Sequence, residues 1–300
     1  MSCRVGAEWM LVTTAAIWGF AFVAQVRGME HVGPFTFNAA RFALGAISLL
    51  PLVLLVRVQR PAAPAPDQRA TLPFSHWPPE LVGGLLAGLL LFAGATFQQV
   101  GLQFTSAANA GFITGLYVIL VPLMGRVLGQ RTSLTVWLGA LLALAGLYAL
   151  SIREGLVLSR GDTLQLVGAF CWAGHVLFIE HLTRRCHVLW LAFSQYMVCA
   201  GLSLIVAVSL ETPSWAGMQA AAGAIAYAGI MSVGVAYTLQ ILGQSRVPAA
   251  RAAIIISLEG VFAAIGGWWL LEQALDLRAL VGCAFMLAGM IVAQLPARRP

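Results

Sequence analysis

The sequence predicts an all-α membrane protein with ten transmembrane helices in two inverted five-helix repeats. Three observations lead to this fold class: the composition, ten long apolar runs, and a similarity between the two halves of the chain. Of the 300 residues, 60% are hydrophobic and 9% are charged, whereas soluble domains are about 45–50% apolar and about 25% charged. The composition therefore excludes an ordinary water-soluble globule.

Ten apolar runs have the length of membrane spans, because a helix needs about 20 mostly apolar residues to cross the hydrocarbon core. Most connections are short, which favours antiparallel neighbours, but residues 58–79 are rich in proline and are expected to form a surface loop. The first run is followed by many others and is interpreted as a retained helix, not a cleaved signal peptide. The runs are Trp9–Val26, Pro34–Val56, Leu81–Leu102, Ala107–Leu123, Leu134–Leu150, Leu164–Ile179, Val188–Leu210, Ala220–Leu242, Ala252–Leu271 and Leu277–Leu295.

The basic residues, all of them arginines, predict the orientation in the membrane. With a cytoplasmic N-terminus, twelve arginines fall on the cytoplasmic side and four on the opposite side, while Arg41 lies inside the second run. Because cytoplasmic loops carry an excess of arginine and lysine, we expect a multi-pass protein of the cell inner membrane with both termini in the cytoplasm. The arginines stand singly or in pairs between apolar runs, so we expect no nucleic-acid partner.

The two halves of the chain resemble each other. Ile17–Gly19 aligns with Cys171–Ala173 at an offset of 154 residues, and Gln98 aligns with Gln240 at an offset of 142. A shorter loop near residues 211–218 accounts for the difference. We therefore divide the chain into repeats at 1–151 and 152–300. Each repeat holds an odd number of spans, so the two must have opposite orientations, an architecture typical of secondary transporters that work by alternating access.

Three motifs give the chain a resemblance to a known family: Ile17–Phe22, Asn38–Phe42 and Thr105–Ala110. With them the chain resembles the EamA-type members of the drug/metabolite transporter superfamily. Leu271-Glu272 matches the acidic ending of such units, whereas Gln130 departs from it in the first half. The resemblance covers nearly the whole chain. It implies a ten-helix inner-membrane carrier, often an exporter of amino acids or other small metabolites, with the substrate path between the halves.

Ionisable side chains inside the hydrocarbon are costly, so each is a functional candidate. Glu259 and His175 are the candidates for proton coupling, because a carboxyl or an imidazole can bind and release a proton. Their structural alternatives are a carboxyl that joins helices and a hydrogen-bonded interior imidazole. Arg41 has three readings: contact with an anionic group of the substrate, bonds to backbone carbonyls, or contact with a lipid headgroup.

Amides and aromatic residues recur at helical spacing on the predicted spans, for example Trp18, Phe22 and Gln25 in the first. A helix face turned to lipid does not need amides, so we place these side chains on a wet interior path, with interhelical hydrogen bonding as the alternative. Aromatic and amide groups together suit a small amphipathic solute such as an amino acid. The predicted substrate path comprises Trp18, Phe22, Gln25, Gln98, Asn109, Tyr117, Trp172, His175, Tyr237, Gln240 and Glu259.

The residue types also limit the chemistry. The chain has no lysine, which excludes a P-loop lysine and a Schiff-base lysine. It lacks H-E-x-x-H and Gly-x-Ser-x-Gly motifs, so we expect neither an enzyme nor a metal nor a cofactor. Its five cysteines include no C-x-x-C pair and are interpreted as buried thiols. The expected partners are a small-molecule substrate, the lipid bilayer and, where transport is active, protons, with the protein a monomer or homodimer.

Among functions, export of amino acids or similar metabolites by alternating access is the first expectation. The alternative is a multidrug exporter of lipophilic cations, with Glu259 as the partner of the cation, and an intramembrane enzyme is a distant third. Three glycine pairs, Gly84 with Gly88, Gly111 with Gly115 and Gly125 with Gly129, predict close approaches between helices.

Overall fold

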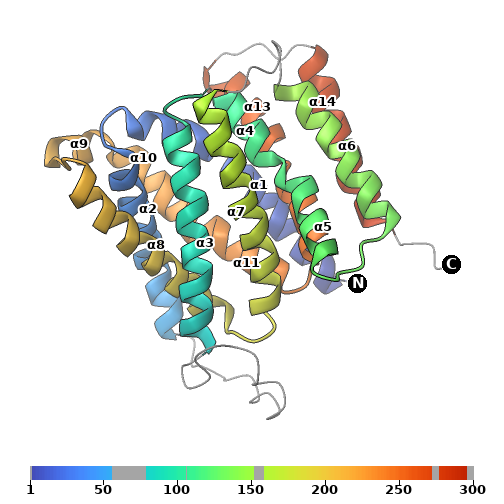
Figure 1. Cartoon of the computed structure of the whole chain (residues 1–300), viewed down its shortest axis with the longest axis horizontal. Helices are drawn as coiled ribbons and strands as arrows, with labels where there is room; N and C mark the ends of the chain where they lie inside the picture. The colour runs from blue at the N-terminus through green and yellow to red at the C-terminus, as the bar shows by residue number, and fades with distance from the viewer. Residues whose placement is uncertain (1, 56–78, 106, 152–158, 272–276, 296–300) are drawn as a thin grey trace.

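The computed structural model describes residues 2–55, 79–105, 107–151, 159–271 and 277–295. Every regular element in these ranges is helical, so the all-α prediction is confirmed (Figure 1). Nine helical stretches among them are long and apolar enough to cross a membrane, and a tenth, Leu134–Ala149, is shorter. The expected loop at 58–79 lies outside the described residues except for Pro79, which begins α3. The chain is a multi-pass membrane protein.

Seven of the ten predicted spans are continuous helices. Their ends follow local sequence signals: Pro34 stands at the first position of its helix, where the missing N–H costs nothing. Ser159 and Asp162 form a capping box at another helix start. The continuous spans are α1 (Ser2–Met29), α2 (Pro34–Leu55), α3 (Pro79–Gly101), α6 (Leu134–Ser151), α7 (Arg160–Leu182), α8 (Val188–Leu210) and α14 (Leu277–Gln294).

The other three predicted spans are interrupted, which the sequence analysis did not predict. The fourth consists of α4 (Ala107–Gly115) and α5 (Tyr117–Val127), and the ninth consists of α12 (Ala249–Ile256) and α13 (Glu259–Leu271). In the eighth, an eleven-residue π-helix separates two short α-helices. A further short helix, α9 (Trp215–Ala220), occupies part of the loop expected at 211–218. The eighth span comprises α10 (Ala222–Ala226), the π-helix η2 (Tyr227–Tyr237) and α11 (Thr238–Gln244).

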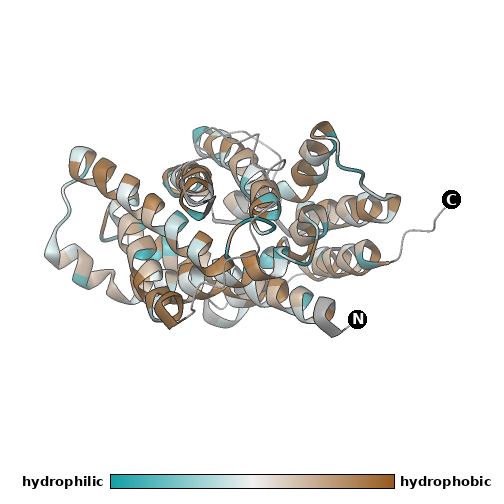
Figure 2. Cartoon of the chain, turned by 90° about the horizontal axis from the view of Figure 1, so that it is seen from below, coloured by the Kyte–Doolittle hydropathy of each residue, from teal (hydrophilic) through white to brown (hydrophobic). Residues whose placement is uncertain are grey.

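The helices form one bundle around α1, which packs on α11, α12, α13 and η2. α2 packs on α8 and η2, α3 packs on α7 and α8, and α6 pairs with α14 at one side of the bundle (Figure 1). Large apolar side chains cover much of the outside: Leu55 is 78% exposed and Val208 65%. Figure 2 shows hydrophobic residues along most of the helices. Such a surface is suited to lipid.

A glutamate that the sequence analysis did not single out fastens the start of α2 to the end of α8. The Glu211 carboxylate accepts hydrogen bonds of 2.8 Å from the backbone N–H groups of Phe35 and Thr36, and one of 2.6 Å from the Thr36 hydroxyl. These N–H groups belong to the first turn of α2 and have no partner within the helix. One side chain thus joins the first predicted repeat to the second.

The three glycine pairs of the sequence analysis differ in whether helices approach closely at them. A Cβ at Gly84 or Gly88 would meet Ser194 or Val198 at less than 3 Å, so α3 approaches α8 closely there, as predicted. The prediction is wrong for the third pair, because α5 ends at Val127 and Gly129, with φ of +82°, lies beyond it. In the second pair, a Cβ at Gly115 would lie 2.5 Å from Leu147 of α6, whereas a Cβ at Gly111 would meet nothing within 4 Å. The structure adds glycine contacts between α6 and α14 that the sequence analysis missed.

The α6–α14 contact generates a stability prediction. A Cβ at Gly146 would lie 2.5 Å from the carbonyl oxygen of Gly282, and a backbone oxygen cannot rotate away. Gly146→Ala should therefore lower the melting temperature of the purified protein in detergent, although alanine is the better helix former by about 1 kcal/mol. Overpacking of this kind costs about 1–3 kcal/mol.

Gly201→Ala is the matched control, because a Cβ at Gly201 would meet nothing within 4 Å. This variant should melt at the same temperature as the unmodified protein or slightly above it. A Gly146→Ala protein that melts as high as the Gly201→Ala protein would show that the two helices do not approach as described.

Candidate functional site

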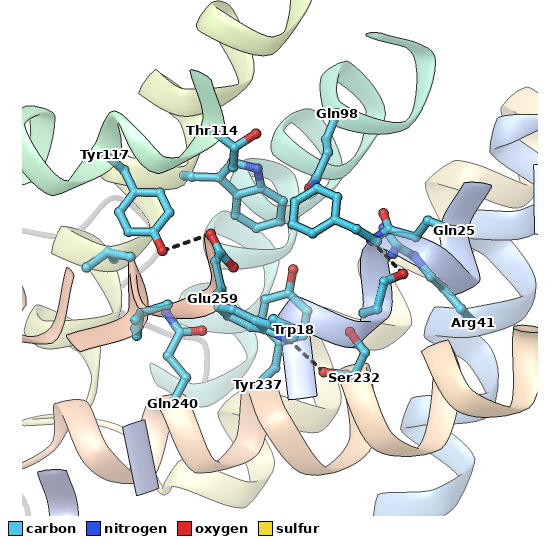
Figure 3. Close-up of a pocket in the computed structure, with 15 residues that line it drawn as sticks. Trp18, Gln25, Arg41, Gln98, Thr114, Tyr117, Ser232, Tyr237, Gln240 and Glu259 are labelled. Carbon is cyan, nitrogen blue, oxygen red and sulfur yellow. Dashed lines mark hydrogen bonds between the residues drawn. The ribbon is translucent and has the colours of Figure 1, made fainter. Parts of the chain in front are cut away.

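A cavity of about 50 Å³ lies in the interior of the bundle, where side chains from both halves of the chain converge (Figure 3). A water molecule needs about 10–15 Å³ of such space, so the cavity in this conformation has room for a few waters. Its walls combine aromatic rings, amides, an arginine and a carboxyl group. The lining residues are Trp18, Ala21, Phe22, Gln25, Arg41, Gln98, Thr114, Tyr117, Trp172, Val176, Ser232, Tyr237, Gln240, Ile256 and Glu259.

The breaks in the fourth and ninth spans lie beside this cavity. At the first break the Leu116 N–H donates to the Ile113 carbonyl over 3.2 Å, and at the second the Leu258 N–H donates to the Ile255 carbonyl over the same distance. Such i to i−3 bonds tighten the last turn and satisfy backbone groups that a helix end would otherwise leave open. The backbone therefore remains hydrogen-bonded at both breaks.

The residues just beyond the breaks contact each other across the cavity. Tyr117 is the first residue of α5 and Glu259 the first of α13, and the Tyr117 hydroxyl donates to Glu259 Oε1 over 3.0 Å. The start of a helix carries a partial positive charge, which favours a carboxylate at that position. Glu259 is 6% exposed, and no salt bridge to it occurs among the described residues.

Aromatic rings form one wall of the cavity. The Trp18 and Tyr237 rings meet edge to face with centroids 4.5 Å apart, and the Trp172 ring stacks on Tyr237 at 6.1 Å. The Trp18 Nε1–H donates to the carbonyl oxygen of Ser232 over 3.2 Å, which fixes that indole against η2. The corresponding Nε1–H of Trp172 has no hydrogen-bond partner in the described part of the chain.

The amide side chains are only partly satisfied. Gln240 Nε2 donates to Gln244 Oε1 over 2.9 Å, and Gln244 in turn donates to the carbonyl of Val176 over 2.8 Å. Gln25 Nε2 donates to the carbonyl of Ala21 over 3.3 Å. The carbonyl oxygens of the Gln25 and Gln240 amides have no partner among the described residues. Buried amides with spare acceptors are able to bind a polar solute.

Arg41 belongs to the lining, although we did not place it on the predicted path. The side chain is 3% exposed, and its guanidinium carbon lies 5.0 Å from the Phe42 ring centroid and 5.7 Å from that of Phe37. These are cation–π distances. Nε has no hydrogen-bond partner, and no salt bridge to Arg41 occurs among the described residues. The sequence signal was the position of an arginine inside an apolar run.

Nine of the eleven predicted path residues line this one cavity. His175 does not: it lies behind the wall, where Nε2 is 2.9 Å from Gln195 Oε1 and the ring packs edge to face on Trp172 and Tyr237. The backbone of Asn109 is part of α4, but its side chain lies outside the described residues. The structure thus brings most of the set together, while the part each residue plays in transport stays a prediction.

Besides Arg41, five other lining residues were absent from the predicted substrate path. Thr114 is a polar residue of the fourth apolar run, and Val176 follows Trp172 by one helical turn, so both have a sequence signal. Ala21, Ser232 and Ile256 had none, because small or apolar residues are common throughout the chain. Within the described residues, no group of three or more His, Cys, Asp or Glu side chains is arranged to hold a metal ion.

A bundle of apolar helices around a buried polar and aromatic cavity defines a polytopic membrane transporter. Comparison with known proteins identifies which kind: the EamA-like transporter family matches residues 6–152 and 159–294. The chain belongs to this family. The resemblance inferred from the three sequence motifs is therefore confirmed.

The relatives are transporters of uncharacterized specificity. An uncharacterized transporter of Archaeoglobus fulgidus is 30% identical over 296 residues, which cover 97% of this chain and 87% of the relative. The uncharacterized transporter YoaV of Bacillus subtilis is 20% identical over 288 residues, or 94% of each protein. A solved structure, described as a crystal structure of protein, matches 98% of both chains with a TM-score of 0.77 at 21% identity, which shows a shared fold.

The Tyr117–Glu259 hydrogen bond generates the second prediction. Tyr117→Phe and Glu259→Gln each weaken this buried contact, and Tyr117→Phe leaves a carboxyl oxygen without its donor, which costs about 1–3 kcal/mol. The double variant should lose less stability than the sum of the two single losses, because both changes act on the same contact. Thermal unfolding of the four proteins in detergent measures this coupling.

Tyr148→Phe is the control, since Tyr148 is 49% exposed and its ring lies against Phe112 and Arg278. Its loss should add to that of Glu259→Gln without coupling. Strictly additive losses for Tyr117→Phe and Glu259→Gln would contradict the described contact.

Proposed function

We propose that this protein exports small organic metabolites, in the first instance amino acids, across the cell inner membrane by alternating access between two inverted repeats. The observation that carries the proposal is the cavity: it lies among the helices of the bundle, is lined by aromatic and amide side chains, and is shared by both halves of the chain. Its present volume of about 50 Å³ holds only a few waters. An amino acid therefore requires the two halves to move apart, as alternating access provides.

The make-up of the cavity wall supports the inverted repeats. Ten of its fifteen residues form five pairs related by the repeat offsets, which are 154 residues for the first two spans and 142 for the later ones. Repeats that face each other across an axis in the membrane plane place equivalent residues around that axis. The pairs are Trp18 with Trp172, Phe22 with Val176, Gln98 with Gln240, Thr114 with Ile256 and Tyr117 with Glu259.

Helix packing gives the same support. α3 packs on α7, and α1 packs on η2, which are equivalent pairs if α1 corresponds to α7 and α3 to the eighth span. α2 packs on α8, and α6 packs on α14, so these helices pair with their own equivalents. The spans broken at Leu116 and Leu258 also correspond, with the same backbone bond at each break.

The arrangement of the arginine-bearing turns supports cytoplasmic termini. The ends of α5, α7 and α11 lie toward the same side of the bundle as the N-terminus in Figure 1. Arginines flank these ends at positions 126, 131, 184, 185, 246 and 251. By the positive-inside rule this side faces the cytoplasm.

Glu259 is the proposed proton-coupling residue, because it lines the cavity and lacks an ionic partner among the described residues. His175 is the second candidate, one layer behind the wall. The same carboxyl favours the alternative function, export of lipophilic cations, since such a cation would supply the missing partner. The substrate panel below separates the two functions.

The test is uptake by proteoliposomes that contain the purified protein. Labelled amino acids, nucleobases and quaternary ammonium compounds are offered with and without an imposed pH gradient. Accumulation of amino acids supports the proposal, whereas transport of lipophilic cations alone would establish the alternative. Absence of transport for every compound in both conditions would contradict the proposed function.

The third prediction concerns coupling. Glu259→Gln should abolish the increase in uptake that a pH gradient produces, because an amide does not bind and release a proton at these pH values, while downhill exchange at saturating substrate should persist. Glu80→Gln, which changes a carboxyl at the start of α3 outside the cavity, serves as the control and should keep the full response. An unchanged pH response in Glu259→Gln would remove Glu259 from this role.

A further inference from the structure

We propose that the cavity binds its solute as a zwitterion: Arg41 contacts a carboxylate of the solute and Glu259 contacts its ammonium group. This inference rests on the transport function proposed above and defines the substrate class by charge. It assigns Arg41, which the predicted path omitted, to the binding site. It also distinguishes amino-acid export from the alternative, export of lipophilic cations, because a lipophilic cation has no carboxylate for Arg41 to contact.

Arg41 and Glu259 carry opposite charges and lie in the same cavity. Arg41 and Glu259 are 3% and 6% exposed, line the same cavity, and form no salt bridge with each other or with another described residue. Ionisable groups inside a membrane protein normally pair with each other or with a ligand, because an unpaired buried charge is costly. Two groups of opposite charge without ionic partners in one cavity indicate a ligand that carries both of the complementary charges.

The two charged side chains lie apart from each other in the cavity wall. Figure 3 shows Arg41 and Glu259 on opposite sides of the lining, with Trp18 and Tyr237 drawn between them. The two side chains form no direct ion pair, so each is available to an oppositely charged group of a bound solute. An α-amino acid has a carboxylate, an ammonium group and a side chain, and the aromatic wall of Trp18, Trp172 and Tyr237 offers the side chain a place to pack.

Several hydrogen-bonding groups of the lining residues have no partner among the described residues. A carboxylate accepts hydrogen bonds, and Arg41 Nε and Trp172 Nε1 are buried donors with no partner among the described residues. An ammonium group donates hydrogen bonds, and Gln240 Oε1 is a buried acceptor without one. Gln240 lies beside Glu259 in Figure 3, so an acceptor and a carboxyl are available at the same end. Both kinds of group that a zwitterion needs are present.

The two repeats differ in which charged residue each contributes to the cavity. At the repeat offsets, Arg41 corresponds to Gln195 and Glu259 corresponds to Tyr117, so each half of the chain contributes one charge that the other half lacks. Gln195 is occupied by its contact with His175. The charge axis of the cavity therefore runs from one repeat to the other. A solute with a single charge would leave the opposite group buried without a partner, and it is selected against for that reason.

The test uses three matched triads of ligands and the purified full-length protein in detergent. Each triad contains an amino acid, the amine that lacks its carboxylate and the acid that lacks its ammonium group: alanine with ethylamine and propanoate, leucine with 3-methylbutylamine and 4-methylpentanoate, and phenylalanine with phenethylamine and 3-phenylpropanoate. Calorimetric titration measures each affinity. In at least one triad the amino acid should bind about tenfold or more tightly than both analogues, as expected for the loss of one charged contact.

Two variants assign the charges to their residues. Glu259→Gln should lose the preference for the amino acid over the acid, and Arg41→Gln should lose the preference for the amino acid over the amine. Arg41→Lys keeps the charge and should retain more of the preference than Arg41→Gln. Arg126→Gln and Glu80→Gln, which lie outside the cavity, are the controls and should bind all three ligands as the unmodified protein does. The triads in the unmodified protein test the proposal even where a variant does not fold.

Each outcome decides the proposal. Amines that bind as tightly as the amino acids would overturn it in favour of cation recognition, and acids that bind as tightly would overturn it in favour of anion recognition. Absence of binding in every triad, with transport of another compound in proteoliposomes, would overturn the zwitterion site and leave the transport function intact. Absence of both binding and transport would contradict the proposed function itself.

Discussion

The structure depends on one constraint: inside a bilayer, no backbone N–H or C=O group can be left without a hydrogen-bond partner. A continuous helix meets this constraint by itself, which is why the outer helices such as α6, α8 and α14 are unbroken. A break is tolerated only where protein or a cavity surrounds it. The breaks at Leu116 and Leu258 lie beside the cavity. The N–H groups of these two residues also remain hydrogen-bonded, to carbonyls three residues earlier.

These breaks also explain how polar groups come to lie in the middle of the membrane. Each break ends one short helix and starts another, so Tyr117 and Glu259 occupy first turns, where the partial positive charge of the helix start favours a carboxylate. The π-helix η2 makes a comparable change in the eighth span, where the Ser232 carbonyl accepts from Trp18. The cavity is therefore built from irregular backbone and fixed aromatic rings, and lipid-facing helices isolate it.

Much of the site was predictable because polar side chains are rare in this chain and are costly in hydrocarbon. Gln25, Gln98, Gln240 and Glu259 stood out for that reason, and all four line the cavity. The breaks were not predictable, since residues 113–120 and 254–261 are mostly apolar and contain no proline, and a continuous helix satisfies the same pattern. His175 does not line the cavity, because a polar residue on the face of Trp172 can also bond to a neighbouring helix, as it does to Gln195.

The sequence by itself determined that this is an all-helical membrane protein with about ten spans, because apolar run length and composition follow directly from the thickness of the bilayer. It also indicated the family and most of the cavity residues. Only the tertiary structure decided that Arg41 and Glu259, 218 residues apart, share one cavity without pairing, and that Tyr117 supplies the hydroxyl bound to Glu259. The reason is physical: the distance between two side chains depends on how the helices pack, and helix packing is not encoded in the spacing along any one helix.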